Sequence, residues 1–237
     1  IAEEMVSTIV GRVEADALDN IKTKRPDNMD SYDLVLQGLE YAKKGNVMKE
    51  NTQKAVELFE KAIEVEPSYA RAHAWRACTL SNLADWEESP DPKIFENAIE
   101  SAKLALELDS NEPEVHRIMG ALKLWFERDH EMARYHFEKA RELCPSDVFI
   151  ISRYAIMLIY FAEFDKALEE LERAKRLDPF SHDLIFGPEA TCHYWLDNPK
   201  EALQTFKKVK VKKNYLFYMA LTYKKIGDND QASEILR

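Results

Sequence analysis

Apolar residues recur three and four positions apart along most of the chain, and charged residues fill the positions between them. This spacing places the apolar residues on one face of a helix, so it predicts a succession of amphipathic helices. Many of the apolar positions hold alanine, which lets a second helix approach closely. The clearest examples are the series Ala55-Phe59-Ala62, Ala98-Ala102-Ala105, Ala133-Phe137-Ala140, Ala167-Leu171-Ala174 and Ala202-Phe206-Val209.

The ends of four of these predicted helices have similar sequences. "AIEVEP", "ALELDS", "ARELCP" and "AKRLDP" end at Pro67, Ser110, Pro145 and Pro179, which are 43, 35 and 34 residues apart. A fixed period of this length indicates a solenoid of repeated helical pairs, and proline suits the break between two helices. The predicted repeats cover 30–237, with approximate boundaries at 31–67, 68–110, 111–145, 146–179, 180–212 and 213–237, the last incomplete.

Residues 1–29 do not follow this period. Apolar residues from Ile1 to Leu18 predict a separate amphipathic helix, and the polar sequence "KTKRPDNMD" predicts a linker after it. The sequence therefore predicts two regions, an N-terminal helix with its linker and a helical repeat array.

The repeat pattern resembles the tetratricopeptide repeat, a helix–turn–helix unit of 34 residues. Small residues fill the position where the two helices of that repeat approach each other, and Gly227 fits its turn. The resemblance implies an all-α, right-handed superhelix (an α-solenoid) of about six helical hairpins, with the extra N-terminal amphipathic helix. An ordinary helical bundle is the alternative. The small residues are Gly38, Ala77, Gly120, Ala155, Ala190 and Ala220.

The first forty residues carry a closer resemblance. "IAEEMVSTIVGRVEADAL" and the "YDLVLQG" sequence at Tyr32–Gly38 are similar to the region after the catalytic part of bacterial class III adenylate/guanylate cyclase-like proteins with C-terminal tetratricopeptide repeats. This resemblance implies a regulatory or docking region of a signalling protein. The first residue is Ile1 rather than Met, so we expect a piece of a longer protein.

Composition excludes several classes of protein. The formal charge of −10 argues against a general nucleic-acid binder, which usually carries a basic stripe. No apolar run reaches the roughly 18 residues of a membrane span, so no membrane insertion is expected. Cys78, Cys144 and Cys192 lack the spacing of a disulfide framework or a zinc site, which favours reduced thiols in a cytoplasmic protein.

Catalytic motifs are missing from the sequence. It contains no Gly-rich phosphate loop and no GxSxG nucleophile motif. His130 and His136 are six residues apart, which places them on different faces of a helix and argues against a zinc site. Cys192 and His193 are adjacent, so their side chains diverge by about 100° on a helix. We therefore expect no enzyme, no catalytic residue, no metal and no cofactor.

The candidate binding surface follows from the resemblance. In tetratricopeptide-repeat proteins the first helix of each repeat lines a concave groove, and basic and aromatic side chains there suit an acidic or aromatic-containing peptide. Two alternatives stay open, since the aromatic residues could only pack and the arginines could pair with glutamates as structural tethers. The predicted partner-binding residues are Arg71, Asn82, Arg117, Trp125, Arg153, Tyr160, Tyr194 and Trp195.

The predicted function is a protein–protein interaction scaffold, the regulatory or docking region of a bacterial adenylate cyclase-like signalling protein. It would bind a protein or peptide in its concave groove. The alternative is an oligomerisation module that self-associates through the N-terminal helix or the ends of the solenoid.

Overall fold

The computed structural model describes residues 28–45, 48–89, 91–180, 182–210 and 212–236. Throughout these residues the regular elements are helices, and none is a strand. The predicted N-terminal amphipathic helix lies outside the described residues. The chain divides into two compact units, whose described parts end at Cys144 and begin at Pro145, respectively. Each unit is described by itself.

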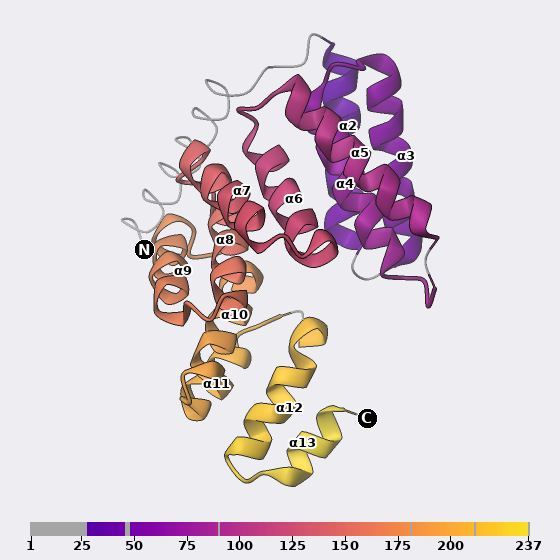
Figure 1. Cartoon of the computed structure of the whole chain (residues 1–237). Helices are drawn as coiled ribbons and strands as arrows, with labels where there is room; N and C mark the ends of the chain where they lie inside the picture. Colours follow the sequence, from indigo (N-terminus) through magenta and orange to yellow (C-terminus); the bar gives the residue numbers. More distant parts are fainter. Residues whose placement is uncertain (1–27, 46–47, 90, 181, 211, 237) are drawn as a thin grey trace. The chain divides into compact units, whose positions relative to one another are not determined.

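The first unit contains three pairs of helices that pack in chain order, α2 with α3, α4 with α5 and α6 with α7 (Figure 1). Their first helices also contact one another, α2 with α4 and α4 with α6. A short π-helix, η1, extends α6. The elements are α2 (Met29–Gly45), α3 (Lys49–Val65), α4 (Ala70–Ala84), α5 (Pro92–Leu108), α6 (Pro113–Leu122), η1 (Lys123–Glu127) and α7 (His130–Leu143).

The second unit has the same organisation. Consecutive helices again pack in pairs, and α10 contacts both α8 and α12. Both units therefore consist of sequential antiparallel pairs, as the repeat pattern predicts. The elements are α8 (Val148–Tyr160), α9 (Phe164–Leu177), α10 (His182–Trp195), α11 (Pro199–Phe206), the 3-10 helix η2 (Lys212–Tyr215), α12 (Leu216–Lys225) and α13 (Asn229–Ile235).

The alanine series form the contacts between paired helices. Ala55, Ala98, Ala133, Ala167 and Ala202 are all fully buried, as the spacing predicts. Glycine brings two of the pairs still closer. A Cβ atom at Gly38 would lie 2.6 Å from Phe59, and one at Gly120 would lie 2.8 Å from Phe137.

The turns inside four of the pairs share one backbone conformation. Arg128, Ala162, Asp197 and Gly227 have φ values of 57°, 59°, 60° and 88°, in the left-handed region. Each lies just after the first helix of its pair and reverses the chain for the second. Only Gly227 adopts this conformation without steric strain, since the other three residues carry a Cβ atom.

Helix starts are also fixed by local sequence. Three helices have a proline in their first turn, at Pro92, Pro113 and Pro199. Proline is tolerated there because the N–H groups of the first turn have no hydrogen-bond partner within the helix. Asp129 caps α7 and Asp147 caps α8 by accepting hydrogen bonds from backbone N–H groups. None of the described helices is long and apolar enough to cross a membrane.

Candidate partner-binding surface

Arg71 lies on α4 and is held by an ion pair. Its guanidinium donates to Glu112 Oε1, with Nη2 at 3.1 Å and Nε at 3.3 Å. Glu112 is 2% exposed and also caps α6 by accepting from the Glu114 N–H. Arg71 thus joins the second pair of helices to the start of the third, as the tether alternative expects.

Arg117 lies on α6 and is 4% exposed. Its Nε donates to Glu114 Oε2 at 2.6 Å, and its guanidinium lies 5.1 Å from the centre of the Trp75 ring. Nη2 lies 3.9 Å from the Cys78 sulfur. Burial opposes the charge, but Glu114 and Cys78 outweigh it and raise the pKa of Arg117 above its usual value. These contacts leave little of the guanidinium for a partner.

The two other predicted residues of the first unit are accessible. Asn82 is exposed near the end of α4. Trp125, on the π-helix η1, is 40% exposed and packs edge-to-face against Phe137. Phe126 beside it is 38% exposed and contacts Phe95. The end of α6 therefore presents an aromatic surface of its own.

In the second unit, five aromatic rings form one connected group, here named the aromatic cluster. Trp195 stacks on Phe164 with ring centres 6.2 Å apart and planes 8° apart. Tyr194 and Trp195 both contact Tyr218 edge-to-face, and Phe217 lies 6.1 Å from Tyr218. Trp195 is 51% exposed and Phe217 is 63% exposed. The cluster comprises Phe164, Tyr194, Trp195, Phe217 and Tyr218.

A lysine borders this cluster. Lys225 Nζ lies 4.5 Å from the centre of the Tyr194 ring and donates to Asp197 Oδ1 at 2.8 Å. It also donates to the Tyr194 carbonyl at 3.2 Å. The cluster thus combines accessible aromatic faces with an adjoining charged pair.

The remaining two predicted residues lie on α8. Arg153 is half-buried, and its guanidinium lies 4.8 Å from the centre of the Phe149 ring. Tyr160 is 44% exposed, and its ring packs edge-to-face against Phe161. The structure therefore brings together Tyr194 and Trp195 from the predicted set. It adds Phe164, Phe217 and Tyr218, which sequence reasoning missed. Phe217 and Tyr218 lie near the start of α12, the first helix of the last repeat. Applying the same repeat register to that helix could have identified them as candidate binding residues.

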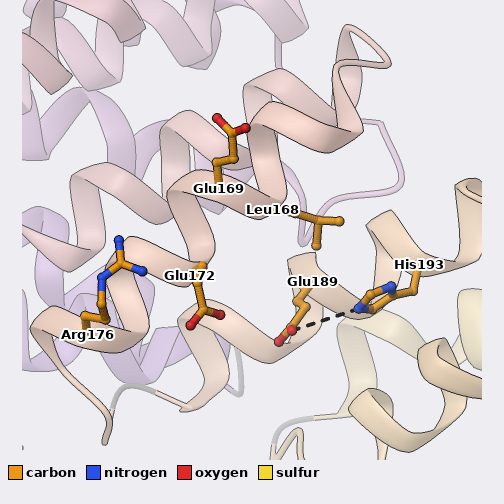
Figure 2. Close-up of a pocket in the computed structure, with 6 residues that line it drawn as sticks. All are labelled: Leu168, Glu169, Glu172, Arg176, Glu189 and His193. Carbon is orange, nitrogen blue, oxygen red and sulfur yellow. Dashed lines mark ion pairs between the residues drawn. The ribbon is translucent and has the colours of Figure 1, made fainter.

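A pocket of about 410 Å³ opens between α9 and α10. Figure 2 shows the residues that line it, which are Leu168, Glu169, Glu172 and Arg176 from α9 and Glu189 and His193 from α10. Glu189 Oε1 accepts from Lys175 Nζ at 2.6 Å and lies 3.9 Å from His193 Nε2. Its Oε2 atom and His193 Nδ1 are buried without a hydrogen-bond partner. A charged network of this kind supports α9–α10 packing and offers no set of metal ligands.

The other chemical candidates from the sequence differ in burial and reactivity. His130 is exposed, whereas His136 is buried. Cys192 is buried and its thiol pKa is raised to about 12, mainly by burial and also by Glu189 and Asp165. No group of three or more His, Cys, Asp or Glu residues suited to a metal ion occurs among the residues that the structure describes.

Several solved structures share this arrangement of paired helices. PilW, a type IV pilus biogenesis factor, is 19% identical, with 88% of this chain and 91% of that chain covered and a TM-score of 0.63. A thermophilic TPR (tetratricopeptide-repeat) protein of Thermus thermophilus is 17% identical, with 87% and 98% covered and a TM-score of 0.61. The fold is that of the tetratricopeptide repeats. The all-α repeat fold predicted from the sequence is therefore confirmed.

Human IFIT1 with m7Gppp-AAAA also shares the tetratricopeptide-repeat fold. It is 20% identical, the match covers 93% of this chain and 53% of that chain, and the TM-score is 0.69. No protein-family model matches the sequence, and no curated protein matches it either. At these identities the structural likeness concerns the fold alone.

Proposed function

We propose that this chain is a protein-interaction scaffold that binds a peptide or partner protein through the first helices of its repeats. The aromatic cluster is the observation that carries the proposal. Accessible tryptophan and tyrosine rings supply most of the binding energy at many protein interfaces, because they bury a large area at a small entropic cost. Trp195 and Phe217 each leave more than half of their surface exposed.

The predicted residues enter this proposal in two roles. We assign direct partner contact to Asn82 and Trp125 in the first unit, and to Arg153, Tyr160, Tyr194 and Trp195 in the second. Arg71 and Arg117 are assigned a supporting role, because buried or nearly buried glutamates already engage their guanidinium groups. The chain would act by binding alone, without catalysis or a cofactor.

The cellular context of the scaffold is a finer part of the proposal. The resemblance of the first forty residues supports a regulatory or docking region of a bacterial cyclase-like signalling protein. This part depends on sequence resemblance only. The reading frame upstream of Ile1 tests it, since a catalytic cyclase domain should be encoded there.

Peptide binding tests the proposal directly. An array of random 12-residue peptides would be screened with the wild-type chain, and selected peptides would be measured by calorimetry. Trp195→Ala with Phe217→Ala should weaken their binding by at least about tenfold, equivalent to about 1.4 kcal/mol. Phe180→Ala is a matched control, because Phe180 is 64% exposed and lies outside the cluster. Equal losses in the two variants, or no selected peptides, would contradict the proposal.

Self-association is the second candidate function, and α13 favours it. None of its residues is buried, and Leu236 just after it is 61% exposed. Leu236 is thus an exposed apolar side chain beside the last described helix, and such a side chain is a potential contact for a second copy. Light scattering at several concentrations separates the two functions. A mass that doubles with concentration, and that Leu236→Glu restores to the monomer value, would support this alternative.

A further inference from the structure

Two buried imidazoles face each other inside the first unit. His116 on α6 and His136 on α7 are each 3% exposed, and their Nδ1 atoms lie 3.0 Å apart. Their ring centres are 5.1 Å apart, and the Tyr135 ring meets both edge-to-face. The pair therefore bridges the two helices of one hairpin.

The hydrogen bonds determine where the protons lie. His116 Nε2 lies 3.0 Å from the Ser110 carbonyl, which can only accept, so Nε2 carries a proton. In neutral His116 the Nδ1 atom is then an acceptor. His136 must donate its Nδ1–H to that atom, which defines both tautomers. His116 is thus neutral in the arrangement that satisfies every contact, and His136 is the donor across the pair.

The bond from histidine to the preceding turn occurs twice in this unit. His73 Nε2 lies 2.8 Å from the Pro67 carbonyl, six residues earlier, as His116 does with Ser110. In the second unit the residues six positions after Pro145 and Pro179 are Ile151 and Ile185, both buried. Isoleucine therefore fills the same repeat position without a titratable group.

Charged groups of both signs surround the pair. Asp109 and Glu142 favour a charged His116, and Lys139 opposes it. Asp129 favours a charged His136, and Lys123 opposes it. Burial is the largest effect for both rings and lowers both pKa values, that of His136 to about 4 with a contribution from His116.

We propose that the His116–His136 pair is a pH-dependent lock on the α6–α7 hairpin. When both rings are neutral, the Nδ1–H···Nδ1 bond joins the helices. When both rings bind a second proton and become imidazolium cations, two Nδ1–H groups and two positive charges oppose each other at the same contact, and the hairpin loosens. Trp125 on η1 packs on Phe137, the neighbour of His136, so the loosening reaches an exposed aromatic residue. This inference goes beyond the proposed scaffold function and does not depend on it.

The direction of the pH dependence follows from the lowered pKa values. An unfolded histidine has a pKa of about 6.5. Above that pH the two histidines are neutral in both the closed and the opened hairpin, so the pair contributes its full stabilisation to the closed state. As the pH falls from about 6.5 towards 4, the opened state binds protons that the closed state does not, and stability is lost.

Hydrogen exchange on the intact chain tests the lock. Protection factors of the α6 and α7 amides, corrected for intrinsic rates, should fall at least about tenfold between pH 7.5 and 5.0. In His116→Ile with His136→Leu the fall should be less than about threefold, because neutral apolar residues replace the pair. His130→Gln, an exposed change on α7, should behave as wild type. A flat wild-type profile, or an equal fall in the double variant, would overturn the proposal.

A second measurement covers the case in which the double variant does not fold. Imidazole resonances of the wild-type chain would be followed by NMR during an acid titration. Both rings should stay neutral at pH 6, and the loss of α6–α7 amide protection should accompany their protonation. Titration of either ring with an ordinary pKa near 6.5, while the hairpin stays protected, would reject the lock.

Discussion

At the scale of single residues, three of the four left-handed turn positions carry a residue other than glycine, which is the residue that this backbone conformation favours. A non-glycine residue in this conformation is destabilised by about 1–2 kcal/mol, because its Cβ atom approaches the neighbouring carbonyl. Arg128, Ala162 and Asp197 accept this strain, and Gly227 avoids it. The surrounding helical pairs thus impose the turn on residues that do not favour it.

Ala162→Gly should therefore stabilise the chain by about 0.5–1 kcal/mol, since glycine removes the strain but gains entropy when unfolded. Gly227→Ala is the matched opposite change. A Cβ atom there meets nothing within 4 Å, so only the backbone conformation is altered, and a loss of about 1 kcal/mol is expected. Urea denaturation measures both changes. Destabilisation by Ala162→Gly would show that the turn is not strained.

The arginines illustrate what a sequence pattern can and cannot predict about one residue. Repeat register places Arg71 and Arg117 on first helices, and the structure agrees. The repeat register does not reveal that Glu112 and Glu114 approach these arginines, because those contacts depend on side-chain directions in three dimensions. Register and charge together therefore predict partner-binding residues at two positions where the tether alternative also fits the geometry.

Removing only one member of the buried Arg117–Glu114 pair should be strongly destabilising. Arg117→Met leaves the Glu114 carboxylate without its partner, and we expect a loss of about 3 kcal/mol in the free energy of unfolding. Adding Glu114→Gln should recover most of that loss, because the uncompensated charge disappears. Chemical denaturation of the single and double variants supplies the comparison. A loss below about 1 kcal/mol in the single variant would mean that the pair is not effectively buried.

At the scale of helices, alanine spacing predicts which faces pack, and the structure confirms those faces. The π-helix η1 at the end of α6 has no such signal, because its apolar residues Leu124, Trp125 and Phe126 are equally compatible with an ordinary helix end. The aromatic cluster escaped prediction for another reason. It joins the start of α9 to the end of α10 and the start of α12, and no single helical period spans those positions.

Gly120 offers a test of the closest helix–helix approach. Gly120→Leu should destabilise the α6–α7 pair by about 1–3 kcal/mol, because the new side chain collides with Phe137, although leucine favours helix. Phe137→Ala added to this variant should restore part of the loss by returning the volume. Thermal denaturation would be followed by circular dichroism. An unchanged midpoint in Gly120→Leu would place Gly120 outside the contact.

At the scale of the whole molecule, the repeat period predicted the class of fold, and the division at Pro145 was not predicted. The apolar pattern recurs along the repeats without a break at Pro145, so periodicity gives no sign of a division there. The boundaries of the individual repeats stay predictions. The second unit nevertheless contains three pairs, which is the number that repeat proteins usually need for a stable stack.

Residues 145–237 should therefore fold without the first unit. A fragment of this length is expected to show a helical circular dichroism spectrum and a cooperative thermal transition, because its pairs bury their apolar faces against one another. A fragment of residues 180–237, with two pairs, should be clearly less stable. A non-helical spectrum of the longer fragment would show that the second unit requires its neighbour.

The pairing of helices with their immediate neighbours has a mechanical consequence. Within the described part of each unit, the main helix contacts join elements that are adjacent or next-but-one in the chain. A pulling force would therefore detach one hairpin at a time. Two successive turns, at Arg128 and Ala162, are 34 residues apart, and a chain of that length extends to about 115 Å when stretched. In an optical trap the molecule would behave as a soft, stepwise-extending spring.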